Sequence, residues 1–202
     1  MKTMKHLFAC VAFLLCPLFW VETYGAVLTK DCSGQFVEQM SKAYDYFSRH
    51  DRMPDAIRVG GKEFNSGMML SAGYNLVRKM MAEPQTWMQS DIEYNDSYLC
   101  PDNERNNTLD IDEIALKDLI KLAENAHVFA QKNGVFPNYC TVDSGHKDPD
   151  GSEYPTQMII NAISISFARV FHHYANNGVL PEKVCTWHSD FLRSTANSPK
   201  GN

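Results

Sequence analysis

After its first 25 residues the chain lacks any long apolar run. No later stretch approaches the roughly 20 apolar residues that a membrane-spanning helix needs, so no transmembrane segment is expected in the mature chain. Cations are also few, with 19 Lys and Arg against 24 Asp and Glu, and they form no stripe. Because nucleic-acid binding requires clustered cations that neutralise phosphates, no nucleic-acid partner is expected.

The one apolar run predicts a signal peptide over residues 1–25. Lys2 and Lys5 precede an apolar stretch at residues 7–20, and small residues follow where a signal peptidase cleaves, so the mature chain is expected to begin near Ala26. Cleavage removes two lysines and one glutamate, which changes the formal net charge from −5 to −6. We therefore expect an exported protein of the periplasm, the cell surface or the medium.

Cysteine is scarce as well. Four of the six cysteines remain after cleavage: Cys32, Cys100, Cys140 and Cys185. An even number in an exported chain predicts two disulfides, with three possible pairings that the sequence leaves open. Buried free thiols are the alternative.

The chain does contain one sequence motif three times, a helix stop followed by an apolar residue and a proline. The copies are HDRMPDAI at 50–57, NGVFPNYC at 133–140 and NGVLPEKV at 177–184. Gly134 and Gly178 favour the left-handed conformation that ends a helix, and Asp51 stands at the same place in the first copy. Self-similarity at this spacing is typical of repeat proteins, which mostly bind other molecules.

Each copy is preceded by an amphipathic helix and followed by a short extended segment. Offsets of four, three and four residues place apolar side chains on one helix face. The three stripes are Phe36, Met40, Ala43 and Phe47; Leu119, Ala123, Ala126 and Ala130; and Ile163, Phe167, Val170 and Tyr174. After each proline, alternating apolar residues such as Ile57 and Val59, or Cys140 and Val142, predict a very short strand.

These elements predict a mainly α-helical fold with short extended segments, a minor α+β component. The first repeat is expected over residues 26–82, where Gly60 and Gly61 turn the chain into a second helix at about 64–82 that buries Met81 among others. Residues 83–108 are predicted to be a linker or surface loop. The rest, 109–202, holds a second repeat with a polar insertion within 143–153, a helix at about 156–175, a partial third repeat and a tail. Tandem helix–stop–strand–helix repeats are thus expected to pack into one compact unit.

This motif of a helix stop, an apolar residue and a proline resembles the pseudomurein-binding repeat. The segment NGVFPNYCTV at 133–142 is the closest match, residues 36–80 resemble a whole repeat, and the third copy is partial. The resemblance implies non-catalytic attachment to a cell-wall polymer, often beside a transglutaminase-like cysteine peptidase domain that this sequence does not show. Because the leader and paired cysteines indicate a bacterial envelope, peptidoglycan or another envelope glycan or peptide is the expected ligand.

Exposed residues around the post-proline segments are the predicted ligand-binding surface, since rigidly held loops commonly carry function. They are Asp55, Arg58, Asn138, Tyr139, Glu182 and Lys183, with Trp187 as a possible stacking platform. Turn formation and packing are the alternative roles of these residues. A protein–protein interaction module would use the same surfaces.

An enzyme is the rival hypothesis. Cys185, His188 and Asp190 lie close in sequence, and these residue types form the catalytic set of cysteine peptidases. Such groups normally meet from distant segments, so their closeness in sequence favours catalysis only weakly. We expect no enzyme activity, and the disulfide prediction uses the same Cys185.

No metal site or other cofactor is predicted, although one loop has the oxygen pattern of a calcium site. Its chief candidate ligands are Asp102, Asn106, Asp110 and Glu113. The sixth position lacks the usual glycine, and Pro101 opposes an entering helix, so a solvated loop that leads into the next helix is the expected structure.

Overall fold

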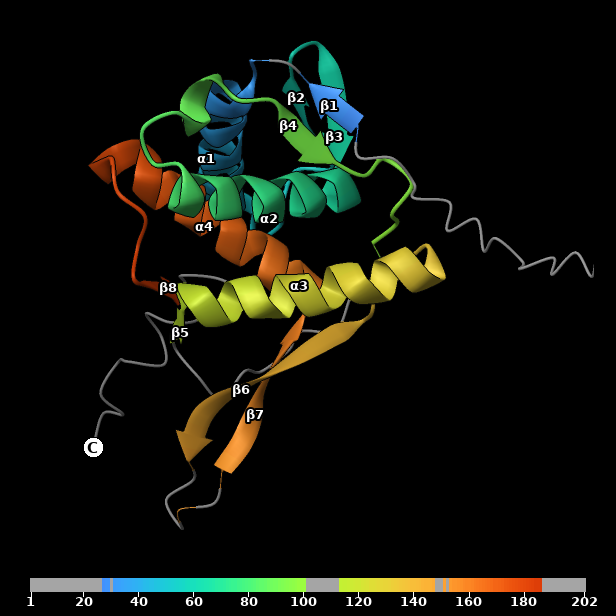
Figure 1. Ribbon diagram of the computed structural model, residues 1–202, viewed down its shortest axis with the longest axis vertical. Helices are drawn as coiled ribbons and strands as arrows, with labels where there is room; N and C mark the ends of the chain where they lie inside the picture. Colours follow the sequence, from blue (N-terminus) through green and yellow to red (C-terminus); the bar gives the residue numbers. More distant parts are fainter. Residues whose placement is uncertain (1–26, 30, 101–112, 148–150, 152, 187–202) are drawn as a thin grey trace, which may run out of the picture.

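The computed structural model describes residues 27–29, 31–100, 113–147, 151 and 153–186 (Figure 1). In these ranges the fold is mainly α-helical with small antiparallel strand pairs, as predicted. The elements are β1 (Val27–Thr29), α1 (Ser33–His50), β2 (Ala56–Val59), β3 (Lys62–Asn65), α2 (Ser66–Ala82), the short 3-10 helix η1 (Trp87–Gln89), β4 (Ile92–Tyr94), β5 (Glu113–Ala115), α3 (Leu116–Asn133), β6 (Tyr139–Lys147), β7 (Glu153–Ile159), α4 (Ile160–Asn177) and β8 (Lys183–Cys185). None of the described helices has the length and apolar character needed to cross a bilayer. The predicted signal peptide lies outside the described residues.

Helix α4 is the centre of the fold. It contacts α1, α2 and α3, and every residue from 162 to 171 is buried. Such all-round burial is typical of a helix enclosed by other elements. Gly73 of α2 faces α4, and a Cβ atom there would lie 3.4 Å from the ring of Phe171, an ordinary van der Waals distance.

The three predicted apolar stripes face this core. The stripe residues of α1 and α3 are at most 2% exposed, and in α4 only Tyr174 is partly exposed. In α2 the prediction that Met81 is buried is wrong, since its side chain is 53% exposed, whereas Met80 is buried. Adjacent residues on a helix differ in direction by about 100°, so the α2 stripe cannot bury both methionines.

The three helix stops form as predicted. Asp51, Gly134 and Gly178 have φ of 54°, 73° and 72°, and each backbone N–H donates to the carbonyl four residues earlier at 2.8 Å. Short strands follow, and the inward side chains of the first two, Ile57, Val59, Cys140 and Val142, are buried.

Each strand that follows a helix pairs with a strand that precedes a helix. The antiparallel pairs are β2 with β3, β4 with β1, β6 with β7, and β8 with β5. Residues 27–94 and 113–185 therefore have the same order of strands and helices and the same pairing scheme. We call them the N-terminal half and the C-terminal half.

The hairpins of the two halves differ in length. Gly60 and Gly61, with φ of 57° and 80°, close the four-residue strands β2 and β3 as a two-residue turn. The polar insertion instead lengthens the second hairpin, whose strands have nine and seven residues and whose register shifts between Val142 and His146. Helix α4 begins at Ile160 and not near residue 156, because the preceding residues belong to β7.

The first part of the predicted linker is integral to the fold. Residues 83–100 contain η1 and β4, and they bury Trp87, Ile92, Tyr94 and Tyr98. The backbone N–H of Asn95 donates to Ser71 Oγ of α2 at 3.0 Å. A three-residue strand is too short for its alternation to be recognised among polar residues, so the sequence alone indicated a loop.

Candidate functional site

The predicted binding residues do not converge on one site. Asp55 and Arg58 lie at β2, Asn138 and Tyr139 at β6, and Glu182 and Lys183 at β8, three strand pairs that Figure 1 shows at different ends of the molecule. All six are exposed. Asp55 lies 3.8 Å from Arg52 and Arg58 lies 3.9 Å from Glu63, which are loose ion pairs. Trp187 lies outside the described residues.

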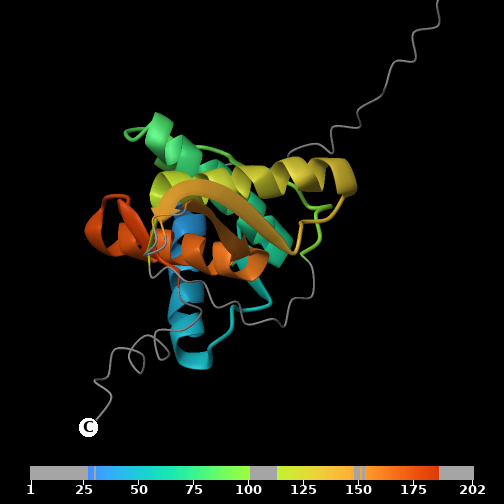
Figure 2. The same cartoon turned by 90° about the horizontal axis from the view of Figure 1, so that it is seen from below.

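Asn138 and Tyr139 do line a groove, between α3 and the start of β6. Figure 2 shows β6 running beside α3. We call it the aromatic groove; its volume is about 440 Å³. It is lined by Asn125, Phe129, Pro137, Asn138, Tyr139, Cys140 and Thr141. Tyr139 is 55% exposed and Phe129 is 43% exposed, so two aromatic side chains face solvent at one open groove.

The helix stop and the proline build this groove. Gly134 ends α3, and Pro137 then holds an extended backbone that returns alongside the helix. Buried Phe136 anchors the connection, and its N–H donates to Leu99 O at 2.9 Å. Asn125 Nδ2 donates to Thr141 O at 2.9 Å, which ties α3 to β6. Alternation along β6 then points Cys140 inward and leaves Tyr139 exposed.

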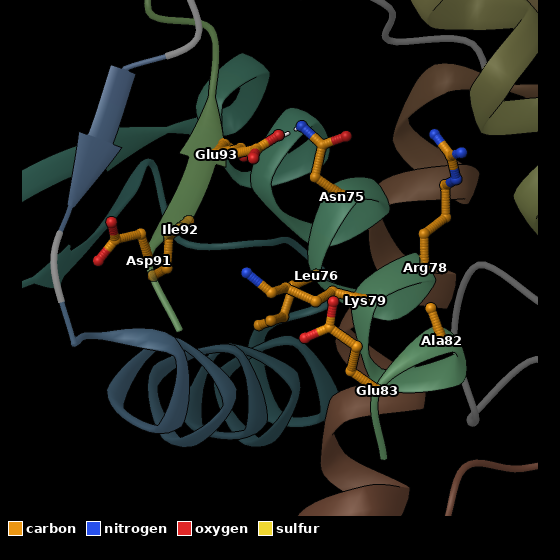
Figure 3. Close-up of a pocket in the computed structure, with 9 residues that line it drawn as sticks. All are labelled: Asn75, Leu76, Arg78, Lys79, Ala82, Glu83, Asp91, Ile92 and Glu93. Carbon is orange, nitrogen blue, oxygen red and sulfur yellow. Dashed lines mark hydrogen bonds between the residues drawn. The ribbon is translucent and has the colours of Figure 1, made fainter. Parts of the chain in front are cut away.

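A second groove lies on the other flank of α3, between α2, β4 and α3. It consists of two adjoining cavities of about 330 and 360 Å³ that share Asn75, Arg78 and Glu93. We call it the charged groove. Charged side chains among its lining residues are Arg78, Lys79, Glu83, Asp91, Glu93 and Glu124. Figure 3 shows how α2 and β4 contribute to the first cavity, and Asn75 Nδ2 donates across it to Glu93 O at 3.1 Å.

His127 lines the charged groove and is 9% exposed. Its Nδ1 lies 2.8 Å from Ala123 O, so the neutral ring donates from Nδ1 and carries a lone pair on Nε2. Within the described part of the chain, that buried Nε2 has no hydrogen-bond partner. The ring stacks on Tyr74 at 4.5 Å and meets Phe136 edge-on. Burial lowers the pKa of His127. The hydrogen bond to Ala123 acts in the opposite direction, and the positive charge of nearby Arg78 lowers the pKa further.

The predicted disulfides are not present, since all four described cysteines are free thiols. Three of the cysteines lie in different parts of the fold. Cys140 of β6 is opposite Met158 of β7, Cys185 of β8 is opposite Glu113 of β5, and Cys32 lies near Gly60. Burial raises the pKa of Cys100 to about 12 and that of Cys140 to about 11. These two thiols therefore stay protonated near neutral pH and are poor nucleophiles.

The rival catalytic set is only partly described. Cys185 is half-buried at the end of β8, and its carbonyl accepts from Arg169 Nη1 at 3.0 Å. His188 and Asp190 lie outside the described residues.

The weak calcium candidates Asp102, Asn106 and Asp110 also lie outside the described residues, and Glu113 is an exposed residue of β5. In the described ranges, no group of three His, Cys, Asp or Glu residues could hold a metal ion.

The sequence did not predict the charged groove. Its residues come from a predicted helix, a predicted linker and a second helix, and nothing in their spacing signals that Arg78, Glu93 and His127 line one groove.

No protein-family model matches the chain, and no curated protein is found to be similar to it.

Proposed function

We propose that this chain is an exported, non-catalytic binding protein that attaches to a cell-envelope polymer, a peptidoglycan-like glycan or peptide. The observation that carries the proposal is the aromatic groove, where exposed Tyr139 and Phe129 flank Asn125 and Asn138. Large aromatic side chains that stay exposed on a rigid scaffold commonly mark a binding surface.

The chemistry of the groove suits a glycan chain. A sugar ring presents apolar C–H faces, which pack on aromatic rings, and hydroxyl groups at its edge, which need donors and acceptors. Tyr139 and Phe129 supply the aromatic faces, and asparagine side chains supply both donor and acceptor atoms. Because the groove is open, a polymer longer than the groove could pass through it and continue on either side.

We also propose that the two halves are copies of one unit related to the pseudomurein-binding repeat. The shared order of elements, the shared strand pairing and the left-handed stops at Asp51 and Gly134 support this proposal. In this interpretation the longer hairpin of the C-terminal half is an elaboration of the shorter one.

A protein–protein interaction module is the second candidate. It is favoured by Val128, which is 61% exposed and lines the charged groove on the other flank of α3 from Phe129. A protein partner that spans α3 would cover both side chains, whereas a sugar chain would chiefly need the aromatic rings.

The test is co-sedimentation of the mature protein with purified peptidoglycan sacculi. We expect binding at low salt, and we expect Tyr139→Ala or Phe129→Ala to weaken it by about tenfold, the effect of losing about 1.4 kcal/mol. Tyr46→Ala on α1 is the matched control, because it makes the same chemical change at a part-exposed site on a helix that does not border the groove.

Absence of sacculus binding would refute the wall-polymer proposal. If Tyr46→Ala and Tyr139→Ala weakened binding equally, the polymer would bind without the aromatic groove. Loss of binding on Val128→Ala with retention on Tyr139→Ala would favour the protein–protein module.

A further inference from the structure

The charged groove has cations and carboxylates on facing walls. Helix α2 contributes Arg78 and Lys79, with Glu83 at its end, and β4 with the residue before it contributes Glu93 and Asp91 (Figure 3). The Oδ1 atom of Asp91 accepts from the Asp31 N–H at 3.4 Å. Among the described residues, neither Arg78 nor Lys79 lies within 4.0 Å of a carboxylate oxygen. Opposite charges that border one cavity without neutralising each other are available to a ligand that carries both charges.

Arg78 is held in place by a neutral partner. Its Nη1 donates to Tyr74 Oη at 3.1 Å, and its guanidinium carbon lies 5.3 Å from the centre of the Tyr74 ring. Tyr74 is buried and stacks on His127, so the tyrosine itself has little freedom. A guanidinium fixed by a hydroxyl keeps most of its N–H donors for an anion, and its planar fork matches a carboxylate.

The opposite wall is fixed as well. Asn75 Nδ2 donates to the backbone oxygen of Glu93, and the adjacent Asn95 N–H donates to Ser71 Oγ, so β4 is tied to α2 at two points. The Glu93 side chain remains exposed. The spacing between the cationic and the acidic wall is therefore set by two hydrogen bonds, each between a short side chain of α2 and the backbone at β4.

His127 is a second, independent sign of a site. It lines the inner of the two cavities, is nine-tenths buried, and among the described residues its Nε2 lone pair has no hydrogen-bond partner. Buried polar atoms are normally satisfied, and an exception commonly marks a functional group. Because the Nε2 atom itself has almost no accessible surface, a ligand N–H group reaches it only when a neighbouring side chain moves aside.

We propose that the charged groove is a binding site for a short peptide that carries both a free amino and a free carboxylate terminus. Arg78 and Lys79 receive the carboxylate, and Glu93 receives the ammonium group. The two cavities, of about 330 and 360 Å³, have room for two or three small residues. This site uses a different flank of α3 from the aromatic groove, and it does not depend on the proposed wall attachment.

The test is an NMR titration of the mature protein with trialanine, N-acetyl-trialanine and trialanine amide. Trialanine is expected to shift the backbone amide signals of residues 75–83 and 91–95. Blocking either terminus is expected to weaken binding at least about tenfold, because each block removes one charge-assisted contact. Arg78→Ala and Glu93→Gln should weaken trialanine binding similarly.

Arg49→Ala is the matched control, since Arg49 is exposed on α1 and bonds only to the Asp45 carbonyl among described partners. Tyr139→Ala separates the two proposals, because it should leave trialanine binding unchanged even if sacculus binding is lost. Absence of shifts in the charged groove, equal binding of the three peptides, or equal loss on Arg49→Ala would overturn the inference.

Discussion

The two halves of the molecule have the same order of elements, yet only one carries the aromatic groove. A shift of 83 residues places Ala56 of β2 on Tyr139 of β6 and Tyr46 of α1 on Phe129 of α3. The N-terminal hairpin closes with two glycines after four residues and buries Ile57 and Val59, whereas the C-terminal hairpin is longer and presents Tyr139 to solvent. The helix, stop and strand are therefore common to both halves, whereas the exposed aromatic residues of the groove belong to one half.

The largest effect should come from a contact between the N-terminal half and the segment that follows it. A Cβ atom at Gly67 of α2 would lie 2.2 Å from Tyr98 O, a backbone atom that cannot move aside cheaply. Gly67→Ala is expected to lower the free energy of unfolding by roughly 3 kcal/mol, in the range of overpacked sites. Chemical denaturation measures it, with Ser66→Ala on the same turn as control. A loss below about 0.5 kcal/mol, the usual size of a surface change, would show that Tyr98 does not pack there.

The pH dependence of stability should come partly from the C-terminal half. Burial lowers the pKa of His127 below its usual 6.5 in the folded state. Below about pH 6.5 the unfolded chain then binds a proton that the folded chain does not, so stability is full above this pH and falls as the pH decreases toward the folded pKa. One proton limits the slope to about 1.4 kcal/mol per pH unit.

Denaturation curves from pH 7.5 to 4.5 measure this slope. His127→Phe keeps an aromatic ring against Tyr74 but cannot titrate, so its stability should fall less over the same interval. Identical pH profiles for the two proteins would mean that His127 is solvated in the folded state.

The smallest effects are expected at the helix stops, where substitutions in the two halves should change stability in opposite directions. Gly134→Ala places a side chain at φ 73° and should cost about 1 kcal/mol, although the added Cβ meets nothing within 4 Å. Asp51→Gly relieves a non-glycine residue at φ 54° and should stabilise by up to about 1 kcal/mol. Thermal unfolding of both variants checks the signs, and a loss of stability on Asp51→Gly would mean that the carboxylate itself holds the stop.

The helices, their stops and the strand after the first proline could be predicted because each has a local physical cause. Strand β3 could not be predicted, since the sequence indicates a turn and the start of a helix at residues 62–65. Phe36, Met40 and Phe47 recur at helical spacing, and Gly134 with Pro137 both ends a helix and prevents its continuation. Strand β4 and the pairing of β5 with β8 could not be predicted, because three-residue strands have too little periodicity and their partners lie far along the chain.

The predicted binding residues lie beside parts of the chain that the sequence does not reveal. Asn138 and Tyr139 were predicted from the post-proline segment and do line a groove, but Phe129 and Asn125 reach that groove through the return of the chain along α3. Asp55 and Glu182 share the same position after a proline but lie at β2 and β8, which are not equivalent in the two halves, since β8 matches β4 in its pairing. The four cysteines show the same limit, since spacing along the chain does not reveal which side chains meet.

The central claim is that the aromatic groove of the C-terminal half holds the ligand. It is tested most directly by backbone amide shifts of the mature protein on titration with soluble peptidoglycan fragments. We predict that the shifts concentrate at residues 125, 129 and 138–141, and that the matching positions 42, 46 and 55–58 of the N-terminal half stay unchanged. Shifts of equal size at both sets, or shifts confined to the N-terminal half, would contradict the claim.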